Sequence, residues 1–268
     1  MKILGCFKVV PDLDLIVDED WAVEGQLQID AGYVKLVWNC FDEGALEMML
    51  RLSDLSESLD VVYELSALTV GKQKHESFLK TLYALGFEHG IRICEEETFL
   101  LPERVAEEIA LYVRKRSMQD VIVMGIQSSD EGNSKVPYLV AEKLQWPCIP
   151  HVIGVEPVDE EHLKVTSQVP GGKQVQTIKI PCVLAVGNVP CAYLRIPTLK
   201  DKIKLGKKPV EQIKPEELGM RGGNASVGIV ALNPVNRSRD TVLIEGNSPQ
   251  EKAVHLYEDY LKRRLSEC

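Results

Sequence analysis

Apolar runs and amphipathic stretches alternate from Met1 to Pro150. Leucine and methionine recur at helical spacing after Trp38, whereas other apolar runs are short enough to be buried strands. We expect strands at Ile3–Val10, Leu59–Val70, Gly90–Cys94 and Asp120–Gly125, and helices at Phe41–Leu55, Lys74–Leu85, Pro102–Met118 and Val136–Leu144. An alternation of strand and helix predicts an α/β fold whose parallel sheet is covered by helices.

The pattern changes after Pro147 to short β-prone runs that are separated by turn residues. Strands are expected at Val152–Val158, His162–Val169, Val175–Ile180 and Cys182–Val186. The pair Gly171-Gly172 predicts a hairpin between the second and third of these strands.

The composition and periodicity change again after residue 187. Residues 188–223 are rich in Lys, Pro and Gly and show little periodicity, which predicts an extended arm with a short helix at Leu199–Leu205. A strand at Thr241–Glu245 and an amphipathic helix at Pro249–Leu265 are expected to follow.

Composition narrows the classes of function. No apolar run approaches the roughly 18 residues of a membrane span, so we expect no stable membrane insertion. A formal net charge of −9 argues against nucleic acid as a partner, because duplex binding requires a basic face. The exception is a basic stretch after Arg195, which contains Lys200, Lys202, Lys204, Lys207 and Lys208.

The seven cysteines are scattered and odd in number, with no C-x-x-C pair and no histidine at metal-ligand spacing. We interpret them as reduced thiols and predict no metal site. The apolar run of residues 1–10 lacks the cleavage site of a signal peptide, so a cytoplasmic location is expected.

The strongest candidate for a binding site is the loop Gly125–Lys135, which follows a predicted strand and precedes a helix. Ligands of open α/β sheets lie at the carboxyl ends of strands, and a helix N-terminus attracts phosphate. Its glycines allow close backbone approach and its hydroxyl and ammonium groups could donate to phosphate: Gly125, Gly132, Ser128, Ser134 and Lys135. The alternative is that these residues only cap and solvate a turn. The loop is neither a Walker motif nor a G-x-G-x-x-G fingerprint.

Asn39 is a second candidate, because it stands at the expected start of a helix near the first strand. It could cap that helix or contact a nucleotide. Catalytic signatures are lacking: the five histidines fall in separate segments, and there is no serine elbow, Cys-His pair or H-E-x-x-H motif. We therefore predict no catalytic residue.

The opening segment Met1–Asp12 is followed by Asn39-Cys-Phe-Asp-Glu-Gly-Ala-Leu-Glu47. Later landmarks, in order, are Thr81–Gly86, Val123–Gln127, Ala141–Pro147 and Ile180–Leu184. Together they resemble electron transfer flavoprotein β subunits, in which the second segment reads N-P-F-D-E-x-A-L-E. Departures at Gly132, Ser134 and Pro137 indicate a divergent member of that family.

The resemblance implies an adenine nucleotide alpha hydrolase-like core sheet flanked by helices, with a β-rich extension and a C-terminal arm. It also implies a non-catalytic electron carrier that pairs with an electron transfer flavoprotein α subunit and serves acyl-CoA or other flavoprotein dehydrogenases. The α subunit would hold most of the FAD. The β subunit would hold AMP, or a second FAD in an electron-bifurcating member. An adenine-nucleotide-binding enzyme or sensor of the same fold is the alternative.

Carried over residue by residue, the resemblance assigns the nucleotide pocket to Cys6, Asn39, Cys40, Phe41, Asp42, Val70, Gly125, Gln127, Ser128, Asp130, Gly132, Asn133, Ser134, Lys135 and Val136. Phe41 would lie toward the flavin of the partner. The docking of dehydrogenases is assigned to Arg195, Leu199, Lys200 and Lys202.

The expected organisation has three parts. Residues 1–187 form the nucleotide-binding α/β domain, and residues 188–223 form a recognition loop and extended arm. Residues 224–268 form a C-terminal strand-helix segment that contacts the partner subunit.

Overall fold

The computed structural model describes residues 1–17, 31–56, 61–96, 100–220, 230–232, 239 and 241–266. The start of the strand expected at Leu59–Val70 lies outside these residues, as do parts of the expected segment 224–268.

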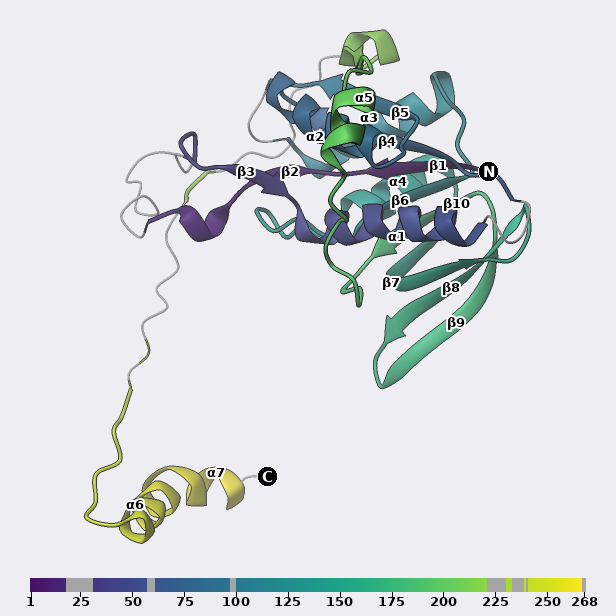
Figure 1. Cartoon of the computed structure of the whole chain (residues 1–268). Helices are drawn as coiled ribbons and strands as arrows, with labels where there is room; N and C mark the ends of the chain where they lie inside the picture. The colour runs from purple at the N-terminus through teal and green to yellow at the C-terminus, as the bar shows by residue number, and fades with distance from the viewer. Residues whose placement is uncertain are drawn as a thin grey trace.

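One large sheet forms the centre of the described structure (Figure 1). Its strands are β1 (Lys2–Cys6), β4 (Glu64–Gly71), β5 (His89–Cys94), β6 (Val121–Gly125), β7 (Cys148–Pro157), β8 (His162–Val169), β9 (Gly172–Lys179), β10 (Cys182–Val186) and β11 (Glu211–Ile213). They lie in the order β11-β5-β4-β1-β6-β10-β7-β8-β9. Every neighbouring pair from β11 to β7 is parallel. The predicted α/β fold with a parallel core is confirmed.

Helices cover both faces of the parallel part. They are α1 (Cys40–Ser56), α2 (Glu76–Ala84), α3 (Pro102–Lys115) and α4 (Val136–Leu144). Successive residues of β1 point to opposite faces, so Ile3 packs with α1 and α2, whereas Leu4 packs with α3 and α4. A strand buried on both faces must be apolar throughout, which explains the Val-Ile-Val-Met run of β6.

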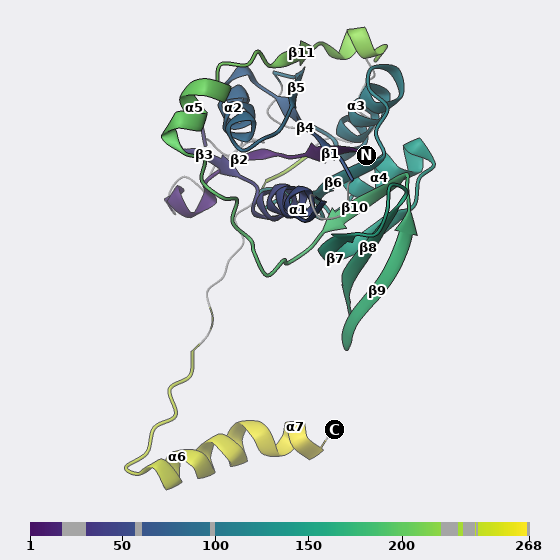
Figure 2. The ribbon, with the colours of Figure 1, turned by 45° about the vertical axis from the view of Figure 1, so that its right-hand side comes forward.

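The strands β7, β8 and β9 form an antiparallel extension. The expected hairpin is confirmed, since Gly171 turns the chain with a φ of +83° that favours glycine. β9 is the edge strand, and its side chains are largely exposed. Figure 2 shows this extension projecting beyond the helical layers.

Three short strands were not predicted as separate elements from the sequence. The strand expected at Ile3–Val10 is divided, because β1 ends at Cys6 and β2 (Val9–Pro11) pairs with β3 (Leu36–Trp38) in a separate small sheet. The chain after the helix α5 (Leu199–Leu205) returns to the large sheet as β11.

The C-terminal part lies away from the sheet in both views (Figures 1 and 2). α6 (Pro249–Leu256), a π-helical turn (Tyr257–Leu261) and α7 (Lys262–Ser266) follow one another without a break, as the helical pattern predicted. The prediction of a strand at Thr241–Glu245 is wrong, because these residues form no strand. Their β-prone side chains are mostly exposed, and a strand requires a neighbour with which to pair. None of the described helices has the length and apolar character to cross a membrane.

Candidate functional site

A cavity of about 640 Å³ lies at the carboxyl ends of β1, β4 and β6. The chain runs from β1 to β4 and β5 on one side of the sheet and resumes at β6 on the other side of β1. Loops diverge at such a switch point, and this divergence leaves a crevice in which ligands of α/β sheets bind. The volume falls within the range of small-molecule sites.

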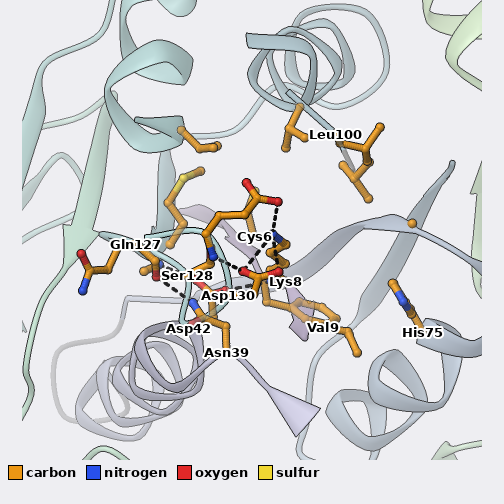
Figure 3. A pocket seen from close by; sticks show the side chains of 18 of the residues that line it. Cys6, Lys8, Val9, Asn39, Asp42, His75, Leu100, Gln127, Ser128 and Asp130 are labelled. Carbon is orange, nitrogen blue, oxygen red and sulfur yellow. Dashed lines mark hydrogen bonds and ion pairs between the residues drawn. The ribbon is translucent and has the colours of Figure 1, made fainter. Parts of the chain in front are cut away.

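Asp42, in the first turn of α1, forms hydrogen bonds to three segments around the cavity (Figure 3). One of its carboxylate oxygens accepts hydrogen bonds from the backbone N–H of Lys8, at 2.8 Å, and from the side-chain amide of Asn39, at 2.9 Å. The other oxygen accepts from the backbone N–H of Gly125, at 2.7 Å. Asp42 therefore fixes the end of β6 against the start of α1 and the chain after β1.

Asn39 extends this network to the loop after β6. Its amide donates to the carbonyl of Gln127 at 2.9 Å, and its side-chain oxygen accepts from the backbone N–H of Ser129 at 3.1 Å. Both interactions run from the residue before α1 to residues about ninety positions later in the chain. The side chain of Asn39 thus holds the loop, and capping of α1 is not the role that its hydrogen bonds among the described residues show.

Gly125 is required where the loop begins. A Cβ at this position would lie 2.6 Å from Oδ1 of Asp42 and 2.7 Å from Cβ of Phe41, distances at which something must shift. The backbone of β6 approaches α1 closely at this point because residue 125 has no side chain.

Lys8 faces the acidic part of the loop. Its ammonium group lies 2.8 Å from Oδ2 of Asp130 and 2.9 Å from Oε1 of Glu131. Burial by itself would lower the pKa of Lys8, but the two carboxylates outweigh it and the pKa is raised. Lys8 is therefore charged, and its charge is already compensated by two acids.

Burial controls the ionisation of Asp42 and Cys6. Burial raises the pKa of Asp42 to about 6, although hydrogen bonds from Lys8, Asn39 and Gly125 oppose the rise. Burial also raises the pKa of the Cys6 thiol, with a smaller contribution from the charge of Asp42, so this thiol is protonated and unreactive. The described residues contain no group of three or more side chains that could hold a metal ion.

Most of the predicted pocket residues line the cavity. They are Cys6, Asn39, Asp42, Val70, Gly125, Gln127, Ser128, Asp130, Asn133 and Val136. Five others lie outside its lining, namely Cys40, Phe41, Gly132, Ser134 and Lys135. The hydroxyl of Ser134 donates to Gln127 at 3.0 Å, and the ammonium of Lys135 lies 3.9 Å from Glu103. Of the three groups expected to donate to phosphate, Ser134 and Lys135 therefore face other protein groups, and Ser128 lines the cavity.

Several lining residues were missed by sequence reasoning: Lys8, Gly71, Lys72, Lys74, His75 and Leu100. The signal for Gly71 to His75 was available, since these residues follow a predicted strand and lead into the first turn of a predicted helix, much as the recognised loop does. Figure 3 shows His75 on the opposite side of the cavity from Gln127 and Ser128.

The residues predicted to dock a partner lie on the surface of the arm that covers α1 and α2. Leu199 is 74% exposed, and Lys200 and Lys202 are exposed beside it on α5. No residue of α5 is buried, so Leu199 is not a core leucine. Arg195 instead pairs with Glu47 and Asp54 of α1, at 2.9 Å each.

A parallel sheet with a cavity at its switch point defines an α/β ligand-binding protein. Comparison with known families identifies the kind: residues 33–218 match the model of the electron transfer flavoprotein domain. This chain belongs to the electron transfer flavoprotein family.

Two relatives agree with this membership. The Escherichia coli (strain K12) protein named "Putative electron transfer flavoprotein subunit YgcR" is 26% identical over 270 residues, which cover 99% of each chain. The electron transfer flavoprotein subunit beta of Syntrophomonas wolfei subsp. wolfei (strain DSM 2245B / Goettingen) is 29% identical over 213 residues, which cover 78% of each chain. The chain is accordingly a divergent member of the β type, with a role in the electron transport of that family.

Proposed function

We propose that this chain is the β subunit of a heterodimeric electron transfer flavoprotein. In this role it carries electrons between flavoprotein dehydrogenases, of the acyl-CoA or another class, and a downstream acceptor in the cytoplasm. The FAD that accepts the electrons is held mainly by the α-type partner subunit. The redox chemistry is then that of the flavin, and this chain contributes binding, orientation and docking.

The observation that carries the proposal is the cavity at the switch point of a chain that belongs to this family. Asn39, Asp42 and the loop after β6 all fall within the matched residues, and hydrogen bonds hold them in place around the cavity. A ligand that enters this preformed cavity does not have to order the loop, and preorganisation favours affinity. We propose that the ligand is AMP, or the adenine half of a second FAD in an electron-bifurcating complex.

The arm supports the docking part of the proposal. Tyr193, Ile196 and Leu199 are large apolar side chains that are more than 70% exposed. Lys200 and Lys202 lie beside them, and such a combination of apolar anchors and steering charges suits a transient protein partner with an acidic surface.

Expression with and without the α-type partner tests the proposal. The chain alone should bind little FAD, whereas the complex should be yellow. Absorbance and nucleotide extraction then separate the mechanisms, because one flavin with one AMP indicates the conventional carrier and two flavins indicate bifurcation. Stoichiometric FAD on the isolated chain would contradict the proposal. A colourless chain that binds AMP and retains no flavoprotein partner would instead support a nucleotide sensor.

A further inference from the structure

Two buried carboxylates, Glu95 and Glu108, share one guanidinium behind a wall of the cavity and are called the acid pair. Glu95 follows β5, and because side chains alternate along a strand it points to the same face as Ile91 and Ile93, toward α3. Glu108 lies on α3 and is fully buried. Nε of Arg104, one turn earlier on α3, lies 3.0 Å from Oε1 of Glu95 and 3.2 Å from Oε1 of Glu108.

The charges of the acid pair do not balance when both acids are ionised. Within the described part of the chain, Arg104 is the only cation within ion-pairing distance of either acid. Oε2 of Glu108 is buried and has no N–H or O–H donor among the described residues. A proton on Glu108 removes both defects, because the neutral carboxyl can donate to Glu95. Burial, together with the hydrogen bond and charge of Glu95, raises the pKa of Glu108 to about 8 against the opposing effect of Arg104.

The helices and the strand packed around the acid pair present apolar side chains and cations that have other partners. β11 and the turn after it contribute Ile213 and Leu218 to the same buried cluster. Lys143 of α4 pairs with Glu107 at 2.5 Å. Lys115, near the end of α3, donates to the carbonyl of Leu218 at 2.6 Å. These two cations are therefore engaged away from the acid pair.

The remaining titratable groups nearby do not replace the proton either. Arg92 of β5 alternates to the other face of the sheet and pairs with Glu76 at 2.9 Å. Tyr112 comes one turn after Glu108, and burial, with a smaller contribution from Glu211, raises its pKa to about 12, so it is neutral. Ionisation of both acids would leave a buried negative charge without compensation, which is strongly disfavoured.

The part of α3 that carries the acid pair also lines the cavity. The lining residues of this wall are Leu100, Pro102, Val105 and Ile109. Arg104 and Glu108 each precede one of them directly in the chain. The backbone N–H of Glu95 donates to the carbonyl of Gly71, which also lines the cavity, at 3.3 Å. Separation of the two acids would therefore move side chains that line the cavity.

We propose that a single proton shared by Glu95 and Glu108 holds the α3 wall of the cavity against β5, and that loss of this proton loosens the wall and weakens ligand binding. The inference rests on the proposed function for the identity of the ligand, which is taken to be AMP. Repulsion between two carboxylates is strong where water is excluded, and it acts to separate β5 from α3. Proton and ligand favour the same closed arrangement, so each strengthens the binding of the other.

The direction of the pH dependence follows from the raised pKa of Glu108. The folded chain holds the proton at pH values at which glutamic acid in an unfolded chain has lost it. The wall is therefore closed at neutral pH and loosens as the pH rises through about 8.

Calorimetric titration of AMP tests the inference on the full chain, in complex with its α-type partner and freed of nucleotide. The affinity of the wild type should fall about tenfold from about pH 7 to about pH 9, the effect of one linked proton. Glu108→Gln should bind AMP equally at both pH values, because an amide reproduces the hydrogen bonds of the neutral acid and does not ionise. Glu95→Gln, a second variant, also leaves one acid beside Arg104 and should likewise lose the pH dependence. Glu107→Gln is the matched control, since Glu107 lies on the same helix but pairs with Lys143, and it should behave as the wild type.

A fall in the affinity of Glu108→Gln equal to that of the wild type would overturn the inference, because another group would then be titrating. A wild-type affinity that does not change with pH would overturn it as well. A wild-type complex that binds no AMP at either pH would instead show that the proposed nucleotide is wrong. Amide hydrogen exchange at the start of α3 then decides without a ligand: faster exchange in the wild type than in Glu108→Gln at the higher pH supports the inference, and equal exchange overturns it.

Discussion

Asp42 is the residue on which the geometry of the site depends most. It is buried, and its carboxylate accepts three hydrogen bonds from N–H donors of three different segments. An amide at this position would direct an NH₂ group at one or two of those donors. We expect Asp42→Asn to lower the free energy of unfolding by about 2–4 kcal/mol at neutral pH, as measured by urea denaturation. A loss below about 0.5 kcal/mol would show that the network does not hold the loop.

The raised pKa of Asp42 predicts that the stability of the chain depends on pH. The pKa of Asp42 rises from 3.8 to about 6 on folding, so the folded chain binds the additional proton between these values. The stability that this proton contributes is fully present below the lower pKa and is lost as the pH rises through the higher one, and it amounts to roughly 3 kcal/mol. Asp42→Asn has no such group, so its deficit relative to wild type should shrink as the pH rises from about 4.5 to about 7.5. A constant deficit across that interval would contradict the raised pKa.

A second substitution that tests the packing of the site is Gly125→Ala. The methyl group of Gly125→Ala would meet Asp42 and Phe41 below 3 Å, including the backbone nitrogen of Asp42, so α1 and β6 must separate. Overpacking of this kind costs about 1–3 kcal/mol, and the displaced loop should bind nucleotide less tightly. Gly172→Ala is the control, since open space surrounds Gly172. Thermal melts in the presence and absence of AMP measure both effects, and equal behaviour of the two variants would refute the close-packing argument.

The residues of the site were predictable to different degrees. Asn39 was a candidate from its place at an expected helix start, whereas Asp42 came from the resemblance to a family. No local pattern shows that they contact residues more than eighty positions away. Lys8 was missed because a lysine beside a strand is unremarkable until the sheet brings β1, β4 and β6 together. His75 differs from it, because the strand-to-helix connection that contains His75 was visible in the sequence.

At the scale of elements, the buried acid Glu47 anchors the arm to α1. Its carboxylate accepts from the backbone N–H of Arg195 at 3.0 Å and pairs with the guanidinium at 2.9 Å. Asp54 pairs with the same guanidinium at the same distance, but its side chain is 60% exposed against 5% for Glu47.

Solvent screening distinguishes the two acids. Glu47→Gln should cost about 2 kcal/mol of unfolding free energy, whereas Asp54→Asn should cost at most about 0.5 kcal/mol. Limited digestion with trypsin should also cleave after Arg195 faster in Glu47→Gln only. Equal rates in both variants would show that burial does not matter for this anchor.

The C-terminal helix allows a prediction about association. Val254, Tyr257, Leu261 and Leu265 recur at helical spacing and are exposed in this chain. Deletion of residues 249–268 should leave the melting temperature of the isolated chain within about 2 °C, because the helix does not support the sheet. The deletion should weaken copurification of the α-type partner. Unchanged copurification would remove this helix from the proposed interface.

Long periodic elements were predicted well and short ones were not. The helix at Val136–Leu144 and the strand at His162–Val169 were predicted at the residues where they occur, because a sustained pattern is bounded by clear turn signals. β3 and β11 have three residues each, too few for alternation to show. The opposite error was made at Thr241–Glu245, where a strand was predicted and none forms. β-prone residues form a strand only where they can pair with the edge of a sheet.

At the scale of the whole molecule, the fold separates two surfaces. The cavity lies at the carboxyl edge of the central strands, whereas α5 packs outside α2 toward the β11 end of the sheet (Figure 2). A ligand in the cavity and a protein docked on α5 would therefore contact different elements. Substitutions on α5 should accordingly change partner recognition without changing the nucleotide site.

Leu199→Ala tests this separation. Truncation of a buried leucine costs about 2–5 kcal/mol, but Leu199 is 74% exposed, so the variant should melt within about 2 °C of wild type. Its flavin spectrum and heterodimer assembly should also be unchanged. The rate of flavin reduction by the physiological dehydrogenase should fall several-fold, because an exposed apolar anchor contributes to docking in proportion to the area that the partner buries. Val175→Ala is the control, since Val175 is also an exposed apolar residue, at 56%, but lies on the edge strand β9, at the other end of the sheet from β11. A normal reduction rate in Leu199→Ala, or an equal loss in Val175→Ala, would reject α5 as the docking surface.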